Sequence, residues 1–150
     1  MTIVAYEPKE LLESTGYLLA RLGSESRKAF VDALARKELT LTGYSVMMLL
    51  GAQPGVTQRW LGKNLGIDPR NLTAILDDLE DRKFIDRGPH MYDRRRNAVR
   101  LTDFGEAQML KLARIGAQVE EEFFKPISAG QRRQLHSILK ALLTRHISQQ

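Results

Sequence analysis

The sequence predicts a mainly α-helical (α+β) fold, and three features of the chain support this prediction. Apolar residues recur at three- and four-residue steps in both terminal parts of the 150 residues, which is typical of amphipathic helices. Helix caps and a helix-ending glycine divide the middle into shorter helices. Two strand-like stretches, 84–87 and 97–101, flank a basic segment and predict a hairpin. We therefore expect long helices at both ends of a compact central module.

The N-terminal part predicts one long amphipathic helix from about Pro8 to Arg36. Gly16 and Gly23 lie inside this segment and weaken the helix locally, so we expect a bend. At about 1.5 Å per residue the helix spans on the order of 40 Å, which is more than a small domain needs to cover its own core. We expect such a helix to pack against another chain or a distant helix.

The C-terminal part predicts two further helices. Thr102 is placed to cap a helix that runs to about Phe124, and Pro126 enforces a break after it. Ser128 and Gln131 have the spacing of a capping box, which begins a last helix with a single apolar stripe. Stripes at both ends of the chain favour a homodimer, although they would also fit an intramolecular core.

The central part predicts three short helices. The first extends over residues 42–52. Thr57 caps the second, which ends at Gly66, a residue able to adopt the left-handed conformation of a helix stop. Asp68 caps the third, with Pro69 at its first position. The last two helices, joined by a tight turn, have the form of a helix-turn-helix.

The third central helix carries side chains suited to base edges on the face opposite its apolar stripe. Arginine bonds bidentately to guanine and asparagine to adenine, while a threonine methyl or an alanine suits the thymine methyl. The predicted base-reading residues are Arg70, Asn71, Thr73, Ala74 and Asp77. Around the start of the preceding helix, the residues expected to contact the duplex are Thr57, Gln58 and Arg59. On an isolated helix, such residues would be ordinary solvated residues of a first turn.

The hairpin that follows carries a cationic tip. The dipeptide Gly88-Pro89 signals its turn. Arg94, Arg95 and Arg96 are available for phosphate or for a narrow minor groove. Asp93 is expected to pair with Arg95, because side chains two residues apart on a strand point the same way. A basic run is usually a solvated surface, but this one lies one element after a helix-turn-helix, so we expect a winged helix-turn-helix.

This arrangement resembles the MarR family of transcriptional regulators over almost the whole chain, from about Leu11 to Ile147. The specific part is Asp-x-Arg, five residues and then Leu-Thr, present here as Asp93, Arg95, Leu101 and Thr102. Members of the family are dimeric winged-helix repressors or activators whose terminal helices form the interface. The resemblance therefore implies a homodimer that binds double-stranded DNA.

The resemblance also implies roles for individual residues. Asp93 would bond Arg95 and brace the wing, and either Arg94 or Arg96 would reach the minor groove. The helix that begins after Asp68 would occupy the major groove.

Other positions extend the match or depart from it. Leu41-Thr42 and Gly105 also fit the family pattern. Lys83 stands where the family commonly has glycine after the recognition helix, and Gly62 replaces a common alanine.

Many members of the family release DNA when a small, often aromatic and anionic compound enters a cleft between the dimer helices and the winged part. Five residues combine soft apolar contacts with one cation and are expected to line such a cleft. They are Tyr17, Arg21, Met47, Met48 and Met109. Methionine and tyrosine at these spacings also fit a plain hydrophobic core, so both interpretations stay open.

Composition narrows the classes of function. Lys and Arg total 23 against 18 for Asp and Glu, giving a formal charge of +5 that favours a polyanionic partner. Aromatic residues make up 7% of the chain, which weighs against a single-strand binder that stacks bases. The chain has no cysteine, so disulfides and thiolate metal sites are excluded.

An enzyme or metal sensor finds no support in the sequence. His90, His136 and His146 have no nucleophile, phosphate loop or metal-ligand spacing near them, so we expect neither a catalytic site, a metal nor a cofactor. The first residues show no secretory signal, and polar residues interrupt the uncharged stretch 39–58, so we expect a cytoplasmic protein without a membrane span.

We expect residues 1–150 to form a single unit. Residues 41–102 would be its winged helix-turn-helix DNA-binding part, and residues 8–37 and 103–148 its dimerisation helices. The expected function is that of a sequence-specific regulator, a ligand-responsive repressor that binds a pseudo-palindromic operator as a homodimer. The alternative is a winged-helix protein-interaction module that does not read DNA.

Overall fold

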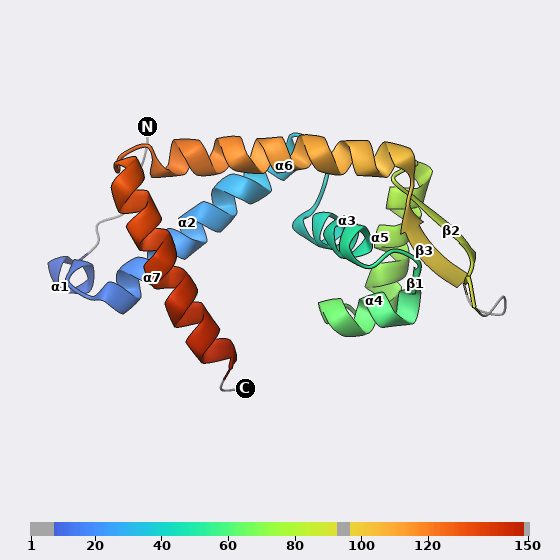
Figure 1. The fold of residues 1–150 in the computed structure, drawn as a ribbon, viewed down its shortest axis with the longest axis horizontal. Coiled ribbons are helices and arrows are strands. Elements are labelled where there is room, and N and C mark those ends of the chain that lie inside the picture. Colours follow the sequence, from blue (N-terminus) through green and yellow to red (C-terminus); the bar gives the residue numbers. More distant parts are fainter. Residues whose placement is uncertain (1–7, 93–96, 149–150) are drawn as a thin grey trace.

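The computed structural model describes residues 8–92 and 97–148 of the chain. Helices dominate, and a small antiparallel sheet completes the fold (Figure 1). The helices are α1 (Lys9–Leu12), α2 (Thr15–Ala35), α3 (Leu41–Ala52), α4 (Gln58–Leu65), α5 (Pro69–Asp81), α6 (Asp103–Phe124) and α7 (Ala129–Ile147). The strands are β1 (Val56–Thr57), β2 (Ile85–Pro89) and β3 (Asn97–Leu101). The predicted mainly α-helical winged helix-turn-helix is confirmed.

The molecule is elongated, and α6 runs along most of its length (Figure 1). Helices α3, α4 and α5 and the sheet lie beneath one end of α6 and form a compact unit over residues 41–101, which we call the winged-helix module. Helix α2 packs against α6 and leads away from this module, and α7 folds back from the far end of α6. One end of the molecule is therefore the compact winged-helix module, and at the other end the long helices α2, α6 and α7 diverge (Figure 1).

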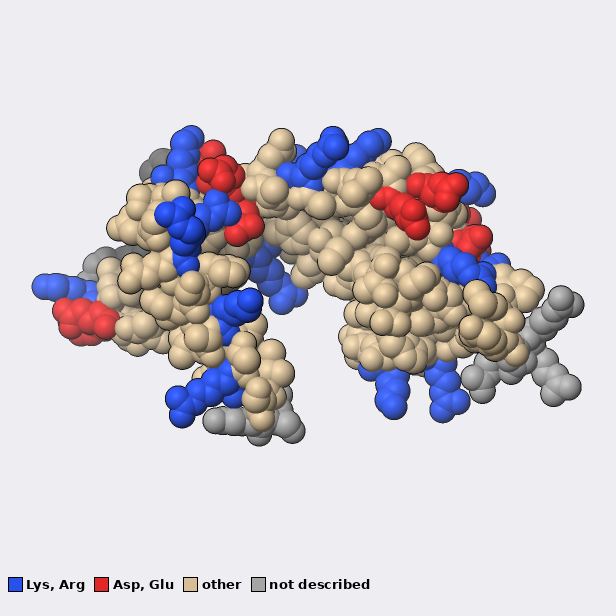
Figure 2. Space-filling model, viewed as in Figure 1, with Lys and Arg blue, Asp and Glu red and all other residues tan. Residues whose placement is uncertain are grey.

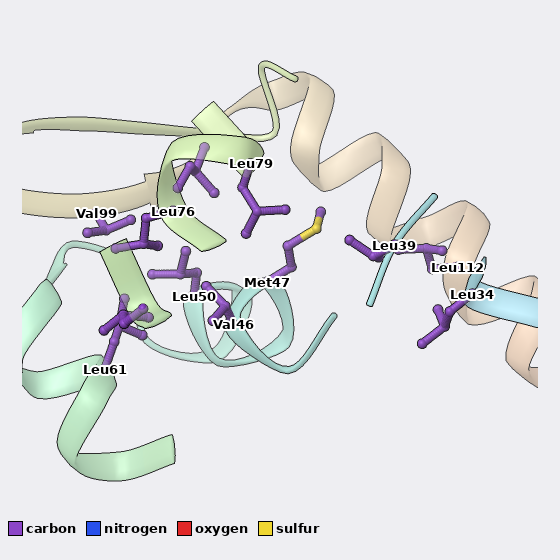
Figure 3. Packing of buried hydrophobic residues seen from close by; sticks show 12 residues of the cluster. Leu34, Leu39, Val46, Met47, Leu50, Leu61, Leu76, Leu79, Val99 and Leu112 are labelled. Atoms are coloured by element: carbon purple, nitrogen blue, oxygen red, sulfur yellow. The ribbon is translucent and has the colours of Figure 1, made fainter. Parts of the chain in front are cut away.

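The hydrophobic core lies in the winged-helix module and at its junction with the long helices (Figure 3). The most deeply buried side chains of the module are those of Val46, Met47, Leu50, Leu61, Leu72, Leu76, Leu79, Ile85 and Val99. Leu34 of α2 and Leu112 of α6 extend the cluster toward the long helices. Because full burial of one such side chain stabilises by about 1.5–3 kcal/mol, this cluster is the main apolar contribution to the stability of the module.

The predicted caps begin the helices where the sequence places them. Asp68 Oδ1 accepts two backbone N–H groups at 3.1 Å each, and Thr57 Oγ1 accepts one at 3.2 Å. Thr102 Oγ1 accepts a backbone N–H at 2.9 Å, and Ser128 makes both bonds of its capping box. Gly66 ends α4 with φ 64°, the left-handed conformation expected of a helix stop.

The prediction of one continuous helix from residue 8 to residue 36 is wrong. The chain breaks between α1 and α2, and neither Gly16 nor Gly23 lies at the break. The cause is Ser14, whose hydroxyl accepts the backbone N–H of Tyr17 at 3.3 Å and so caps a new helix. A cap satisfies an otherwise unpaired amide, which favours a helix start at that residue over continuation.

The sheet has the strand order β1-β3-β2, and both pairings are antiparallel. Strand β1 is only two residues long, too short to show a periodicity, and the sequence did not predict it. Gly88 and Pro89 belong to β2, where they pair with Ala98 and Asn97, so their prediction as the hairpin turn is wrong. Proline fits there because β2 is an edge strand and needs no donor on its outer side.

The first turn of α6 lies directly against the end of α5. Thr102 donates its backbone N–H to the Phe84 carbonyl at 3.0 Å and its hydroxyl to the Lys83 carbonyl at 2.6 Å. Gly105 comes so close that a Cβ there would overlap the Phe84 carbonyl oxygen. Lys83 ends α5 with φ 63°, so the left-handed stop is kept although glycine is absent.

The terminal helices leave apolar side chains in solvent. No residue of α7 is buried, and four of its large apolar residues are 48–64% exposed. They are Ile138, Leu142, Leu143 and Ile147. On α2, Leu18, Leu19 and Leu22 are exposed in the same way. Among the described helices, none combines the length and hydropathy that a membrane span requires.

Candidate nucleic-acid interface

Helices α4 and α5 pack closely around a short left-handed turn. A Cβ at Gly62 of α4 would lie 3.2 Å from the Ile67 carbonyl oxygen and 3.3 Å from Leu72 Cδ2 of α5, so this residue allows the close approach. Both apolar faces turn inward, with Leu61 and Leu72 buried. This pair is the helix-turn-helix that the sequence predicts, and it leaves one long face of α5 outward.

The outward face of α5 carries the five predicted base-reading residues. Arg70, Asn71, Thr73, Ala74 and Asp77 are all exposed. On the inner face, Leu72, Leu76 and Leu79 are fully buried, and Ile75 is half-buried. The inner and outer sides of the predicted recognition helix are therefore as expected, while contact of the outer residues with DNA stays a prediction.

Two of these five side chains are held by bonds to residues of α4, of α5 and of the α5 N-cap. Asn71 donates its side-chain amide to the Asp68 carboxylate, which also caps the helix. Thr73 donates its hydroxyl to the Pro69 carbonyl at 2.8 Å and accepts the Gln58 amide at 2.7 Å. Gln58 thus links α4 to the outward face of α5, and these bonds fix the direction of both side chains before any ligand arrives.

Arg70 differs from these held side chains. It is exposed near the N-terminus of α5, and no hydrogen bond or ion pair of its guanidinium occurs among the described residues. Its five N–H donors therefore face solvent, in the planar arrangement that matches guanine or phosphate. The small neighbour Ala74 lies one turn further along the exposed face and leaves room beside it.

Asp77 is engaged from the sheet. Arg87 of β2 donates to the Asp77 carboxylate at 2.6 Å and to Glu80 at 2.5 and 2.9 Å, and the Arg87 backbone N–H reaches Glu80 at 3.1 Å. The hydrogen bonds from Arg87 lower the pKa of the Glu80 carboxyl, and those to Glu80 and Asp77 raise the pKa of Arg87. We call these three residues the Arg87 clamp, and it ties β2 to α5.

The sequence did not predict the Arg87 clamp. Its signal was present, because Arg87 is two residues from the buried Ile85 and so shares the inner side of β2. A cation on the inner side of a strand that follows an acidic helix end needs a partner there. The contact with Arg87 competes with the predicted contact of Asp77 with a base.

The start of α4 adds basic groups next to α5. Arg59 and Lys63 are exposed and, with Trp60 and Asn97, line a shallow cavity of about 580 Å³. Figure 2 shows basic side chains projecting from the winged-helix module on the side of α4. The Thr57 hydroxyl is used by the helix cap. Lys63 was not among the predicted residues, although it follows Arg59 by one turn and shares its face.

The wing tip falls outside the described residues. Asp93, Arg94, Arg95 and Arg96, with the predicted Asp93–Arg95 brace, therefore stay predictions. The strands that carry them are described, and Arg100 of β3 donates to the Pro89 carbonyl of β2 at 3.1 Å.

The five residues predicted to line an effector cleft occupy different environments. Met47 is fully buried in the core, Met109 packs against that core, and Met48 is 49% exposed. Tyr17 and Arg21 are half-buried on α2, where Arg21 forms an ion pair with Glu25. Their role as ligand residues stays a prediction.

A cavity of about 680 Å³ lies where α2 meets α6. Its lining includes Asp32 and Arg36 from α2 and its C-cap, and Ile115 and Phe123 from α6. None of the five predicted cleft residues is among its lining residues.

Known proteins resemble this chain in sequence and in structure. The MarR family model matches residues 39–96, which covers most of the winged-helix module. The HTH-type transcriptional regulator SarZ of Staphylococcus aureus (strain NCTC 8325 / PS 47) is 31% identical over 96 residues. This match covers 64% of the chain and 65% of SarZ, so it spans a little under two thirds of that relative.

The structural likeness extends over nearly the whole chain. The transcriptional repressor CouR, solved bound to a 23-mer DNA duplex, is 32% identical with a TM-score of 0.71 over 92% of this chain and 98% of that one. CouR from Rhodococcus jostii RHA1 bound to p-coumaroyl-CoA is 26% identical with a TM-score of 0.67, covering 90% and 95%. Wild-type MarR from E. coli shares the fold at 24% identity, with a TM-score of 0.77 over 87% and 96%. The chain belongs to the MarR family.

Proposed function

We propose that the chain is a sequence-specific regulator of transcription that binds double-stranded DNA as a homodimer. The observation that carries this proposal is the outward face of α5, where Arg70 is exposed without a described partner and Arg59 and Lys63 lie on the adjoining helix. A helix of this shape fits the major groove, and the flanking cations suit phosphate. CouR, which is 32% identical to this chain, has been solved bound to a DNA duplex.

The exposed apolar faces of α2 and α7 support the homodimer. Leu19 and Leu22 of α2 and Leu143 and Ile147 of α7 are 51–64% exposed. A helix with no buried residue gains little from packing, and isolated helices are marginal in water. A second copy of the chain would supply the missing cover, and it would place two recognition helices on a pseudo-palindromic site.

We also propose that a small organic molecule regulates this binding and that the unliganded protein represses. One CouR structure holds p-coumaroyl-CoA, and CouR is named a transcriptional repressor. In this chain the cavity between α2 and α6 lies where the long helices meet, so a ligand there would contact both. Its lining places the Phe123 ring beside two cations, Arg36 and Lys37, and two carboxylates, Asp32 and Glu122, which suits an aromatic compound with polar groups.

Binding to the DNA upstream of the chain's own coding sequence tests the proposal. Fluorescence anisotropy should show tighter binding to this duplex than to a scrambled duplex of equal composition, with affinity falling steeply as salt rises. Arg70→Ala should weaken specific binding by about 1–3 kcal/mol and relax the preference at one base position. Arg133→Ala is the matched control, because Arg133 is exposed on α7 and lines no cavity with residues of α4 or α5.

The same titration distinguishes this proposal from the alternative, a winged-helix protein-interaction module that does not read DNA. If the wild-type protein binds neither duplex in a salt-dependent way, the winged-helix module serves protein interaction rather than DNA reading. If both duplexes bind equally, the sequence-specific part of the proposal fails.

A further inference from the structure

Arg82 joins the end of the recognition helix to the end of the long helix α2. It is the C-cap residue of α5, and its Nη1 and Nη2 atoms donate to the backbone carbonyls of Glu38 at 2.7 Å and Lys37 at 3.0 Å. These carbonyls lie 44 and 45 residues earlier in the chain, in the turn that follows α2. One guanidinium thus contacts the ends of two helices.

The C-terminal end of α2, which the Arg82 guanidinium contacts, is a favourable place for a cation. The dipole of α2 leaves partial negative charge at its C-terminus, and the carbonyls that follow the last turn need donors. A guanidinium is planar with donors in a fixed fork, so two bonds to neighbouring carbonyls set its direction as well as its distance. A lysine ammonium would supply charge without this directional constraint.

Arg82 is also held on its other sides. Its guanidinium lies 4.6 Å from the centroid of the Phe84 ring, and it pairs with Asp78 one turn earlier at 3.5 Å. The Phe84 ring lies 5.7 Å from that of Phe104 in the first turn of α6. The Arg82 contact therefore spans the junction at which α2, α5 and α6 meet.

Unusual backbone conformations on both sides of the Arg82 contact support its structural role. The described non-glycine residues with positive φ are Glu38 at 54° and Lys83 at 63°. Glu38 supplies one of the two carbonyls, and Lys83 follows Arg82 directly. Such conformations are unfavourable for residues with a Cβ and persist where surrounding contacts determine them. Both of them lie at this single contact.

We infer that Arg82 is a positioning residue that fixes the angle of the recognition helix relative to α2 and thereby sets the half-site spacing that the dimer accepts. This inference rests on the proposed function, because α2 is part of the proposed dimer interface and α5 is the proposed reading helix. In a symmetric dimer, any rotation of α5 against α2 occurs twice, so it changes the separation of the two recognition helices. Spacing preference is the property that should depend on Arg82.

The test uses the duplex bound most tightly in a selection from random sequences, together with versions that have one base pair inserted or deleted between the half-sites. Wild-type protein should bind the altered spacings at least tenfold more weakly. Arg82→Gln should reduce this discrimination to less than threefold, and Arg82→Lys should give an intermediate value. Arg133→Gln, the same chemical change at an exposed residue in the first turns of α7, lies outside this junction and should keep the wild-type discrimination.

A duplex with one half-site scrambled separates positioning from damage to the reading surface. Arg82→Gln should bind this half-operator within twofold of wild type, because the face of α5 is unchanged. An equal loss on the half-operator and the full operator would overturn the inference, as would unchanged spacing discrimination. If Arg82→Gln shows no cooperative thermal unfolding, Arg82→Lys decides alone, and wild-type discrimination in that variant overturns the inference.

Failure of the inference and failure of the proposed function give different results. Wild-type protein that binds no duplex with a sequence preference removes the proposed function. Wild-type protein that discriminates spacing, with Arg82→Gln doing so equally, removes only the role of Arg82.

Discussion

The two ends of this molecule differ in how completely they are packed. In the winged-helix module, α3, α4, α5 and the sheet enclose side chains such as Leu61 and Leu76 with no exposed surface. In α7, by contrast, no residue is buried, and Leu143 is 61% exposed. The module contains its own core, whereas the terminal helices leave apolar side chains exposed to solvent.

This difference assigns different roles to the two ends of the chain. Burial in the module fixes the shape of the surface proposed to meet DNA, and it does so within one chain. The exposed apolar stripes of α2 and α7 bear on the proposed assembly instead. They would be covered only when a second copy of the chain binds, so the stability gained there would depend on protein concentration. Substitutions at the two ends should therefore differ in kind, one set changing unfolding and the other changing association.

Leu76→Ala should give the largest effect on stability. Leu76 is fully buried in the centre of the core, so the change removes apolar contacts and leaves a cavity. Losses of about 2–5 kcal/mol are typical for such a change and would unfold much of a marginal domain. Urea unfolding followed by circular dichroism measures the loss, and a change below about 0.5 kcal/mol would show that the core is not placed as described.

Gly105→Ala should destabilise by a smaller amount. The added Cβ would overlap the Phe84 carbonyl oxygen, so α6 must shift away from the turn between α5 and β2. Forced overpacking typically costs about 1–3 kcal/mol. Gly23→Ala is the matched control, since its Cβ would meet nothing within 4 Å and alanine favours a helix. Thermal unfolding should show a lower midpoint for the first variant and an equal or higher one for the second.

Leu142→Glu should change association while leaving the module folded. Leu142 is 48% exposed on α7, and a carboxylate buried there at a dimer interface would be unpaired. We expect the dimer dissociation constant to rise at least about tenfold, which corresponds to about 1.4 kcal/mol. Sedimentation measures this, with Lys140→Glu as a control on the same helix. Identical dissociation constants for wild type and Leu142→Glu would remove α7 from the interface.

Arg87→Gln should have the smallest effect on stability and a clear effect on pH dependence. Hydrogen bonds from Arg87 lower the pKa of the Glu80 carboxyl from its ordinary value of 4.5. The pair therefore contributes stability that is fully present above about 4.5 and is lost as the pH falls through the lower pKa of the folded state. Urea midpoints measured from neutral to acidic pH should decline more in wild type than in Arg87→Gln.

The same variant should weaken DNA binding. Without Arg87, the Asp77 and Glu80 carboxylates would stand unneutralised on the proposed reading helix and repel phosphate. Adding Glu80→Gln should restore part of the affinity, and a double-mutant cycle measures this coupling. Strictly additive effects would show that the Arg87 clamp does not act as a unit.

Much of the fold was predictable because local chemistry decides it. Thr57, Asp68 and Thr102 cap helices through their own side chains, and the apolar spacing of α5 fixes which side is buried. The errors arose where a local rule was incomplete. Ser14 caps a helix inside a periodic apolar segment, and Pro89 is tolerated in an edge strand.

The interface was predictable in its surface but not in its internal contacts. The exposure of Arg70 and Ala74 follows from the period of the helix. The contacts of Arg82 with residues 37 and 38, and of Arg87 with Asp77, join segments that the sequence separates by turns of undetermined geometry. Such pairings depend on tertiary placement, so periodicity and spacing alone do not reveal them.

Hydroxyl-radical footprinting of the wild-type protein on its selected duplex tests the central claim most directly. The account predicts two protected patches related by a dyad and about one helical turn, roughly 10 base pairs, apart, which two recognition helices in one dimer would produce. A single patch, or protection that does not depend on sequence, would contradict it.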